Sequence, residues 1–454
     1  MELSPLTALS PIDGRYRDRT RALAQWFSEQ ALMRYRLQVE LAYFTFLCEI
    51  PLEELVGVDT SKLAPVAKRI EDLSTSDAQR IKDIEKVTNH DVKAVEYFLK
   101  ERLDEIGLTK QKEFVHFALT SQDINNTALP LLVKDFVFTH YMPALVALRD
   151  KLHGLALDWA RVPMLARTHG QPASPTRLGK ELQVFVERLD HQLRSIREVP
   201  FTGKFGGATG NFNAHHAAYP ELDWVKLADR FMNEKLGLHR QQFTTQIEHY
   251  DDLAALFDGM RRVNTILIDL SRDLWQYISM DYFRQRIKAG EIGSSAMPHK
   301  VNPIDFENAE GNLGVANALL RHFAEKLPVS RWQRDLTDST VLRNLGVALG
   351  HSLIAHRALE RGLGKVAPDP VRIAADLDDA WEVLGEAVQT VLRAAGVPDG
   401  YELLKDFTRG RRIDQALYRE FVASLPLPED ARSRLAALRP ADYIGLAAQL
   451  ATAR

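Results

Sequence analysis

The chain has 454 residues, enough for about three domains and for a large hydrophobic core without metal or disulfide crosslinks. Its 58 Lys and Arg residues against 61 Asp and Glu residues give a net charge of -3, which provides no general attraction for nucleic acid. Hydrophobic residues at 45% and charged residues at 26% exclude a largely disordered or membrane-embedded chain. The single cysteine, Cys48, excludes an intramolecular disulfide, and the first residues lack the features of a signal peptide. We therefore expect a folded, cytoplasmic protein without a membrane segment.

Long amphipathic helices dominate the middle third of the sequence. Apolar residues at three- and four-residue steps predict a helix over 182–196 that stops before Pro200, and a second helix over 253–277, about 40 Å long. Residues 342–358 are apolar or small on nearly every face, as in an enclosed helix, and Gly346 and Gly350 there allow close packing.

Strand-like alternation is hard to find over six or more residues, which favours a mainly α protein built around a helix bundle. Breaks near 103–112 and at 362–370 (GLGKVAPDP) predict three domains: an N-terminal helical domain of residues 1–110, a central long-helix bundle of 111–365 and a C-terminal helical domain of 366–454. Helices this long and apolar also favour burial between subunits, although one thick monomeric bundle fits the same pattern.

Several common functional motifs are absent. The sequence has no GxxxxGK[ST] loop, no HExxH, no GxSxG and no paired CxxC. The glycine run 203–210 (GKFGGATG) does not match GxGxxG and is interpreted as a loop. The adjacent His215 and His216 point apart on any regular element, and no carboxylate or cysteine cluster completes a site, so we expect no metal.

The most informative segment is 289–308, AGEIGSSAMPHKVNPIDFEN. A hydroxyl on a glycine-flanked backbone, a nearby ammonium and a carboxamide suit removal of a proton next to a carboxylate, where a dianionic intermediate needs stabilisation. From composition alone, an ordinary turn is equally consistent. Two other segments are RTHGQP (167–172), whose His169 would by default be structural, and TSQDINN (120–126), whose Thr120 also suits a helix cap.

These three segments carry a family resemblance. GSSAMPHKVNP resembles the signature loop of the fumarase/aspartase superfamily, RTHGQP its histidine loop, and TSQDINN the loop that holds the succinyl carboxylates. Four further segments resemble the adenylosuccinate lyase family within it: SPIDGRY (10–16), NHDV (89–92), TTQIE (244–248) and SRWQRDLTDSTVLR (330–343). The similarity extends from the first dozen residues to PADYIG near the C-terminus.

The resemblance implies an all-helical, three-domain C–N lyase of purine nucleotide and IMP biosynthesis. Such an enzyme releases fumarate by anti-elimination from adenylosuccinate, giving AMP, and from the succinylcarboxamide ribotide SAICAR, giving AICAR. The resemblance also implies a cytoplasmic homotetramer whose sites are shared between subunits. Its partner would be a phosphorylated purine nucleotide adduct, with no cofactor, metal, nucleic acid or membrane.

The resemblance also implies residue roles. Ser294 is expected to act as the general base and His169 as the acid, with His90 as a second candidate for the acid or for a phosphate contact. Arg15, Arg334, Ser339 and Arg343 suit a phosphate, since they supply cationic and hydroxyl donors. The full set of expected substrate-binding residues is Arg15, Tyr16, Asn89, His90, Asp91, Thr120, Ser121, Gln246, Ser295, Lys300, Asn302, Asn308, Arg334, Ser339 and Arg343.

Three alternatives remain open at this point. A sibling fumarate-releasing lyase, such as argininosuccinate lyase, shares the serine loop and helical core. A non-catalytic structural relative is a second alternative, which the intact Ser294, Lys300, Asn302 and His169 disfavour. RNA binding through the run 409–412 (RGRR) is a third, although four basic residues are more typical of a solvated face.

Overall fold

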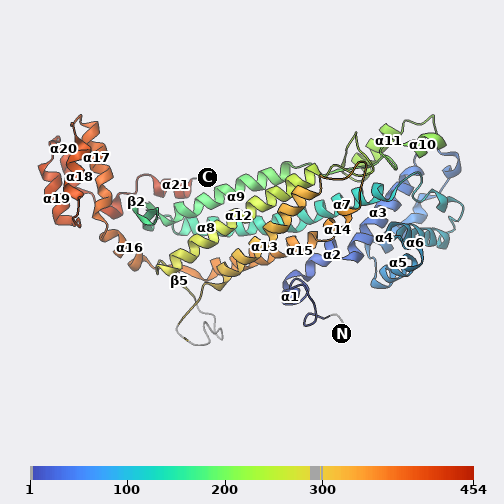
Figure 1. The fold of residues 1–454 in the computed structure, drawn as a ribbon, viewed down its shortest axis with the longest axis horizontal. Coiled ribbons are helices and arrows are strands. Elements are labelled where there is room, and N and C mark those ends of the chain that lie inside the picture. Colours follow the sequence, from blue (N-terminus) through green and yellow to red (C-terminus); the bar gives the residue numbers. More distant parts are fainter. Residues whose placement is uncertain (1–3, 287–296, 298–299, 454) are drawn as a thin grey trace. The chain divides into compact units, whose positions relative to one another are not determined.

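The computed structural model describes residues 4–286, 297 and 300–453. Most of these residues lie in helices (Figure 1), which confirms the prediction of a mainly α protein. Spatial contacts divide the chain into two compact units, one comprising Met1–Leu145, Gln192–Thr265 and Gly311–Ala355, the other Val146–His191, Ile266–Glu310 and His356–Arg454. The three consecutive domains expected from the sequence stay a prediction.

The α-helices follow one another through the whole described chain. They are α1 (Arg17–Thr20), α2 (Ala24–Phe27), α3 (Glu29–Leu47), α4 (Ala64–Glu71), α5 (Thr75–Thr88), α6 (Asp91–Glu105), α7 (Ser121–Phe136), α8 (Met142–Asp158), α9 (Leu178–Glu198), α10 (Asn213–Ala218), α11 (Trp224–Arg230), α12 (Asp251–Ser279), α13 (Ile304–Lys326), α14 (Thr337–Leu342), α15 (Leu345–Lys365), α16 (Pro370–Asp378), α17 (Gly385–Ala394), α18 (Gly400–Thr408), α19 (Gln415–Ser424), α20 (Glu429–Ala437) and α21 (Ala447–Thr452).

Shorter helical turns link these helices. The 3-10 turns are η1 (Arg21–Leu23), η2 (Glu53–Leu55), η3 (Thr60–Leu63), η4 (Gln111–Phe114), η7 (Trp381–Leu384) and η8 (Pro440–Asp442), and the π turns are η5 (Val137–Tyr141) and η6 (Phe231–Lys235).

The strands of the described residues form three two-stranded sheets. The antiparallel hairpin of β1 (Pro163–Thr168) and β2 (Gln171–Arg177) closes between Thr168 and Gln171. The other two pairs are the parallel β3 (Thr202–Gly203) and β4 (His239–Arg240) and the antiparallel β5 (Phe283–Gln285) and β6 (Val366–Pro368). The β1/β2 hairpin was not expected from the sequence, and it carries the RTHGQP segment.

The long predicted helices are confirmed. The series over 253–277 lies in α12, a 29-residue helix, and the series over 182–196 lies in α9, which ends at Glu198 before Pro200. Apolar positions of α12 at helical spacing, such as Phe257, Val263 and Leu267, are fully buried. This burial follows from the three- and four-residue spacing, which places them on one side of the helix.

The break expected at 362–370 begins later than the sequence indicated. Helix α15 continues through Gly362 and Gly364 to Lys365, and α16 starts at Pro370, the first-turn position where proline is tolerated. The two earlier glycines of the 342–358 segment do allow close packing. A Cβ added to Gly346 would lie 2.6 Å from Cβ of Phe27, and one added to Gly350 would lie 3.1 Å from Ile12.

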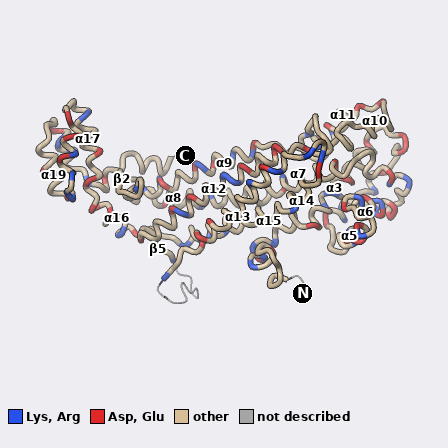
Figure 2. Tube along the Cα trace, in the orientation of Figure 1, with Lys and Arg blue, Asp and Glu red and all other residues tan. Residues whose placement is uncertain are grey.

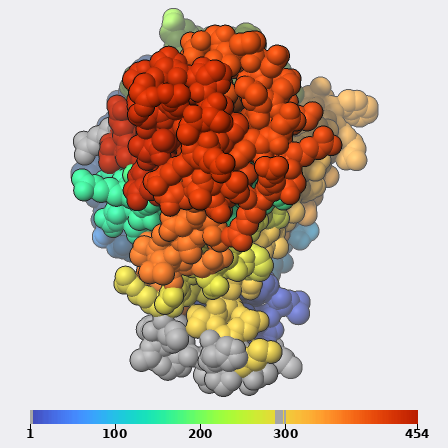
Figure 3. Space-filling model, turned by 90° about the vertical axis from the view of Figure 1, so that its left-hand side faces the viewer, coloured from blue at the N-terminus to red at the C-terminus, as the bar shows by residue number. Residues whose placement is uncertain are grey.

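Each of the two units contains a local hydrophobic core. In the first unit, α3 to α6 share a hydrophobic cluster that includes Leu37, Phe44 and Phe98, all fully buried. In the second unit, α17, α19 and α20 surround a cluster that includes Leu384 and Val422. Figure 3 shows the surface of this C-terminal segment, coloured red, as one closely packed mass. The first cluster matters for the site, because it fixes the ends of α5 and α6.

Charge and hydropathy are distributed as in a globular protein. Lys and Arg are mixed with Asp and Glu along the chain (Figure 2), in agreement with the small net charge. One helical stretch among the described residues, Ser121–Asp158, is long and apolar enough to cross a membrane, and 44% of its most apolar window is buried inside the fold. A single stretch of this kind is weak evidence for a membrane span, since core helices of globular proteins pass the same test.

Candidate active site

The TSQDINN segment forms the N-terminus of α7. Thr120 is the N-cap residue with extended backbone, and its side chain and that of Asp123 form a reciprocal capping box. Thr120 N donates to Asp123 Oδ2 at 2.8 Å. Ser121 is therefore the first helical residue, with its hydroxyl at the positive end of the helix. The segment is a cap, as its composition indicated, and this geometry also suits binding of an anion.

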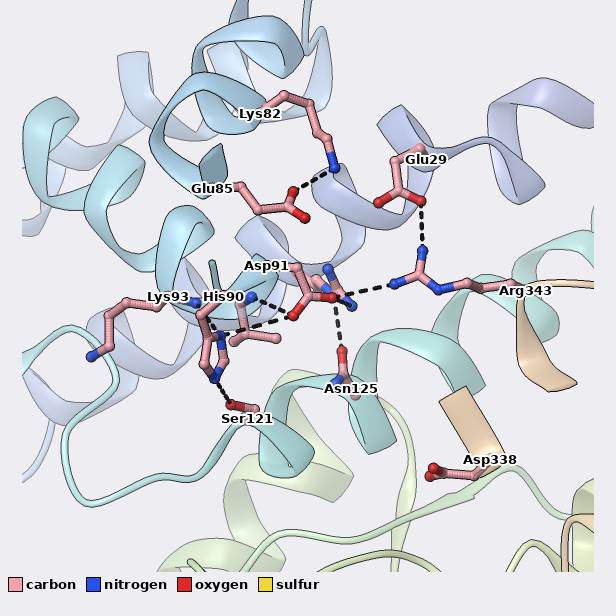
Figure 4. A network of polar contacts seen from close by, with 12 residues as sticks. Glu29, Lys82, Glu85, His90, Asp91, Lys93, Ser121, Asn125, Asp338 and Arg343 are labelled. Atoms are coloured by element: carbon pink, nitrogen blue, oxygen red, sulfur yellow. Dashed lines mark hydrogen bonds and ion pairs between the residues drawn. The ribbon is translucent and has the colours of Figure 1, made fainter. Parts of the chain in front are cut away.

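His90 lies beside this helix end (Figure 4). Asn89 ends α5 in the left-handed conformation at φ 50°, and this turn makes His90 the N-cap of α6. His90 Nδ1 accepts a hydrogen bond from Lys93 N at 3.2 Å, and Nε2 lies 3.4 Å from Ser121 Oγ. In a neutral ring, the proton is therefore on Nε2, which faces Ser121.

The Asp91 carboxylate, next to His90, contacts two guanidinium groups. Asp91 Oδ2 lies 2.9 Å from Arg36 Nη2 and 3.5 Å from Arg343 Nη2. Burial alone would raise the pKa of Asp91, but attraction and hydrogen bonding to Arg36, together with the hydrogen bond from Val92 N and attraction to Arg343, outweigh burial, and the pKa is lowered. Arg36, on α3, also donates to Asn125 Oδ1 at 2.9 Å, and Arg343 is paired with Glu29 at 3.0 Å.

A pocket opens next to these side chains in the first unit. Ser339 and Arg343, two of the predicted phosphate contacts, line it together with Arg36 and Asn125. Its other lining residues are Leu32, Gln122, Leu129, Asp338 and Leu342. Arg36 and Asn125 were not among the predicted site residues: Arg36 belongs to no recognisable motif, and Asn125 lies within TSQDINN, where only Thr120 and Ser121 were expected to bind substrate.

Arg334 and Gln246 form a second contact among the predicted residues. Arg334 Nη1 donates to Gln246 Oε1 at 3.3 Å, although the two lie 88 positions apart in sequence. Asp338 lies 3.9 Å from Arg334 Nη2 and accepts from the buried Tyr250 hydroxyl at 2.9 Å. These hydrogen bonds thus connect the region of the TTQIE segment (244–248) with the SRWQRDLTDSTVLR segment (330–343).

Arg15 and Tyr16 lie at the start of α1. Arg15 is exposed in the preceding turn, and Arg19 stands over the ring of Tyr16 at 5.7 Å.

The remaining predicted residues belong to the second unit. His169 is an exposed residue at the tip of the β1/β2 hairpin, with φ 52°. Close to this tip, Arg167 Nη2 lies 3.2 Å from Asp376, which also accepts from the Tyr282 hydroxyl at 2.8 Å. Of the other predicted residues, Lys300 is exposed, Asn302 precedes α13, and Asn308 lies in its first two turns.

The predicted base, Ser294, and its neighbour Ser295 lie outside the described residues. Over residues 4–286, 297 and 300–453, no group of three His, Cys, Asp or Glu side chains could hold a metal ion. His215 is buried with Nε2 3.3 Å from the Tyr43 hydroxyl, and its neighbour His216 is exposed.

Comparisons with known proteins cover nearly the whole chain. A family model described as "Lyase" matches residues 14–317, and one described as "Adenylosuccinate lyase C-terminal" matches 330–444. The chain is 51% identical to an adenylosuccinate lyase of Dictyostelium discoideum and 49% identical to one of Escherichia coli K12, each over 98% of both chains.

Solved structures show the same fold at lower identity. The 3-carboxy-cis,cis-muconate lactonizing enzyme of Pseudomonas putida has a TM-score of 0.73 at 21% identity, covering 96% of this chain and 97% of that one. A fumarate lyase of Mesorhizobium sp. BNC1 has a TM-score of 0.75 at 18% identity, covering 96% of each chain.

Proposed function

Because this chain belongs to the adenylosuccinate lyase family, we propose that it cleaves adenylosuccinate into AMP and fumarate and SAICAR into AICAR and fumarate. The observation that carries the proposal is its full-length similarity to adenylosuccinate lyases of distant organisms. The match of residues 330–444 to the adenylosuccinate lyase C-terminal model favours this activity over argininosuccinate cleavage.

The elimination needs a base, an acid and a site for negative charge. Ser294 removes the proton on the carbon β to the departing nitrogen, and the electrons are held as an aci-carboxylate. That intermediate collapses to the double bond of fumarate as the C–N bond breaks, and His169 gives its proton to the leaving nitrogen. The exposed position of His169 at a hairpin tip supports this role, because an acid must reach a bound substrate.

Stabilisation of the aci-carboxylate lowers the barrier most. Lys300, Asn302 and Ser295 supply donors from the serine loop, and Thr120 and Ser121 supply donors from the N-terminus of α7. The capping geometry supports this assignment, since free N–H groups of the first helical turn favour an anion. A serine is a poor base in water, so its hydroxyl needs exclusion of solvent and a nearby cation, for which Lys300 is the candidate.

The nucleotide phosphate lies at the other end of the substrate. Arg15, Arg334, Ser339 and Arg343 provide its donors, and the pocket lined by Ser339 and Arg343 supports this part of the proposal. Asn89, His90 and Asp91 complete the binding surface beside it. His90 Nδ1 accepts from Lys93 N, and this contact directs Nε2 toward Ser121, which supports a place for His90 at the binding surface.

We also propose a cytoplasmic homotetramer whose active sites combine residues of different subunits. The long apolar helices support this assembly, because helices such as α12 and α13 expose Trp275 and Val315 at 42% and 47%. Mixing a His169→Ala protein with a Ser294→Ala protein tests it. Subunit exchange restores part of the activity if the sites are shared, and no recovery would count against shared sites.

The activity is tested by a spectrophotometric assay with adenylosuccinate and with argininosuccinate. Wild-type protein should turn over only the first, and Ser294→Ala should lose nearly all activity while keeping its fold. Near-normal activity of Ser294→Ala would refute the base assignment, and turnover of argininosuccinate alone would refute the proposed substrate.

A further inference from the structure

A fully buried ion pair lies behind the N-terminus of α7. Lys204 Nζ and Asp123 Oδ1 are 2.7 Å apart, and both side chains are 0% exposed. Isolated charges are costly to bury, so such a pair persists only where its groups are hydrogen-bonded as well. The reaction proposed above assigns no role to either residue.

The hydrogen bonds of Asp123 connect two segments that are distant in sequence. Its Oδ2 accepts from Thr120 N, closing the cap of α7. Its Oδ1 accepts from Gly206 N at 2.8 Å and from Gly207 N at 3.1 Å, in addition to Lys204 Nζ. The carboxylate thus receives four donors, and the glycine run GKFGGATG is wrapped around it. Moving Asp123 would move Thr120 and Ser121.

Both glycines are needed for this approach. Gly207 adopts φ +80°, a region that side chains rarely occupy, and a Cβ on Gly206 would lie 3.1 Å from Gly210. Lys204 Nζ also donates to Gly207 O, so the ammonium ties the loop to the carboxylate from inside. Burial lowers the pKa of Lys204, and the neighbouring Asp123 carboxylate opposes this shift.

The ion pair also sets the charge at the N-terminus of α7. The first turn of a helix attracts anions through its free N–H groups, but a carboxylate at the third position neutralises that attraction and repels a second anion. The Lys204 ammonium cancels the charge of Asp123 at a distance of 2.7 Å. The cap thereby keeps its rigid hydrogen bonds, while the helix end remains attractive to an incoming carboxylate.

We propose that Lys204 and Asp123 are positioning residues that keep Thr120 and Ser121 oriented and electrostatically available for a carboxylate of the succinyl group. This inference rests on the proposed function. It assigns the pair to the dicarboxylate end of the substrate and not to the nucleotide end.

The test compares binding at the two ends of the substrate. Lys204→Met removes the ammonium while keeping a long apolar stem. We expect kcat/KM for adenylosuccinate to fall at least tenfold and the inhibition constant of fumarate to rise at least tenfold, whereas the inhibition constant of AMP should change less than twofold. Arg240→Met is the matched control, because Arg240 is another buried cation, 2.7 Å from Asp229, and neither residue contacts α7 through a hydrogen bond or ion pair among the described residues.

A second variant covers the case in which Lys204→Met does not fold. The double variant Asp123→Asn/Lys204→Met leaves no unpaired charge but weakens the cap, because an amide has only one acceptor oxygen. We expect it to raise the fumarate constant at least threefold with AMP inhibition unchanged.

The outcomes separate the two proposals. If a folded Lys204 variant keeps the wild-type inhibition constant for fumarate, or if its inhibition constants for fumarate and AMP rise equally, the positioning role is wrong. The proposed function is judged separately, by turnover of adenylosuccinate by the wild-type protein. Absence of wild-type turnover of adenylosuccinate would overturn both.

Discussion

The segment that leads into Thr120 is anchored by a second buried pair, and its removal gives a quantitative prediction. His116 Nδ1 lies 2.6 Å from Glu40 Oε1, with the side chains 13% and 0% exposed. Among the described residues, the other oxygen of Glu40 has no hydrogen-bond partner. His116→Asn keeps a residue that tolerates φ 61° but leaves the Glu40 carboxylate buried and unpaired.

The expected cost of His116→Asn is about 3 kcal/mol, at the lower end for breaking a buried pair because the histidine is partly exposed. Glu40→Gln should cost less, about 1 kcal/mol, since a neutral imidazole can be buried more easily. The double variant should therefore be more stable than the sum of the two single changes predicts, with a coupling energy of about 2 kcal/mol.

The pH dependence of this contribution has a defined sign. Burial alone would lower the pKa of His116, but attraction to Glu40 and their hydrogen bond outweigh burial, so the pKa is raised. The stabilisation is therefore fully present below the unfolded pKa of about 6.5 and is lost as the pH rises through the folded-state pKa. The difference in unfolding free energy between wild type and the double variant should be larger at pH 6 than at pH 9.

Urea unfolding followed by tryptophan fluorescence measures these differences at both pH values. Lys226→Met, which removes an exposed ion pair with Asp223, is the control and should leave the midpoint unchanged. Additive effects of His116→Asn and Glu40→Gln, or a difference that grows with pH, would refute the assignment of a buried, charged pair.

Two further predictions concern packing and polar contacts in the first unit. Gly346→Ala should lower the unfolding free energy by about 1 to 3 kcal/mol, because the new Cβ would lie 2.6 Å from Cβ of Phe27. The control Gly154→Ala should not destabilise the protein, because no atom lies within 4 Å of its new Cβ. Equal denaturation midpoints of the two variants would contradict this prediction. Tyr250→Phe removes the hydroxyl that donates to the buried Asp338 at 2.9 Å, and it should lower the unfolding free energy by about 1 to 3 kcal/mol. Thermal or urea unfolding measures this change, and a midpoint equal to that of wild type would show that the hydrogen bond contributes little.

The helices of this protein were predictable because their signal is local. Each apolar position of α12 is three or four residues from the next, so a short window contains the pattern. The cap at Thr120 was predictable for the same reason, since Asp123 lies three positions away.

The hairpin that carries His169 was missed because its strands do not alternate. Prolines at 163, 172 and 175 and a register shift between Met164 and Ala166 obscure the two-residue period. A signal was nonetheless present: His169 and Gly170, at φ 52° and 76°, form a two-residue turn with positive φ at both positions, which glycine favours.

The supporting residues of the site could not be found from local patterns. Arg36 contacts Asn125 across 89 positions, and Lys204 contacts Asp123 across 81. In the sequence, Arg36 is a charged residue within a helical segment and Lys204 is one residue of a glycine-rich segment, and neither position indicates a partner. Their partners are determined by how distant segments pack together, and this packing cannot be read from a single sequence.

The separation between Asp123 and Lys204 has a consequence for the order of events during synthesis. At about 5 to 20 residues per second, a ribosome needs roughly 4 to 16 seconds to add the 81 positions between them. During that interval α7 has been made, but the lysine that neutralises its buried carboxylate has not. Helix formation itself is faster by many orders of magnitude, but α7 alone is a 16-residue segment with an internal proline, and most of the stability of such a helix comes from packing. The N-terminus of α7 can therefore acquire its final, charge-balanced form only after Lys204 and the glycine run that contacts Asp123 have been added.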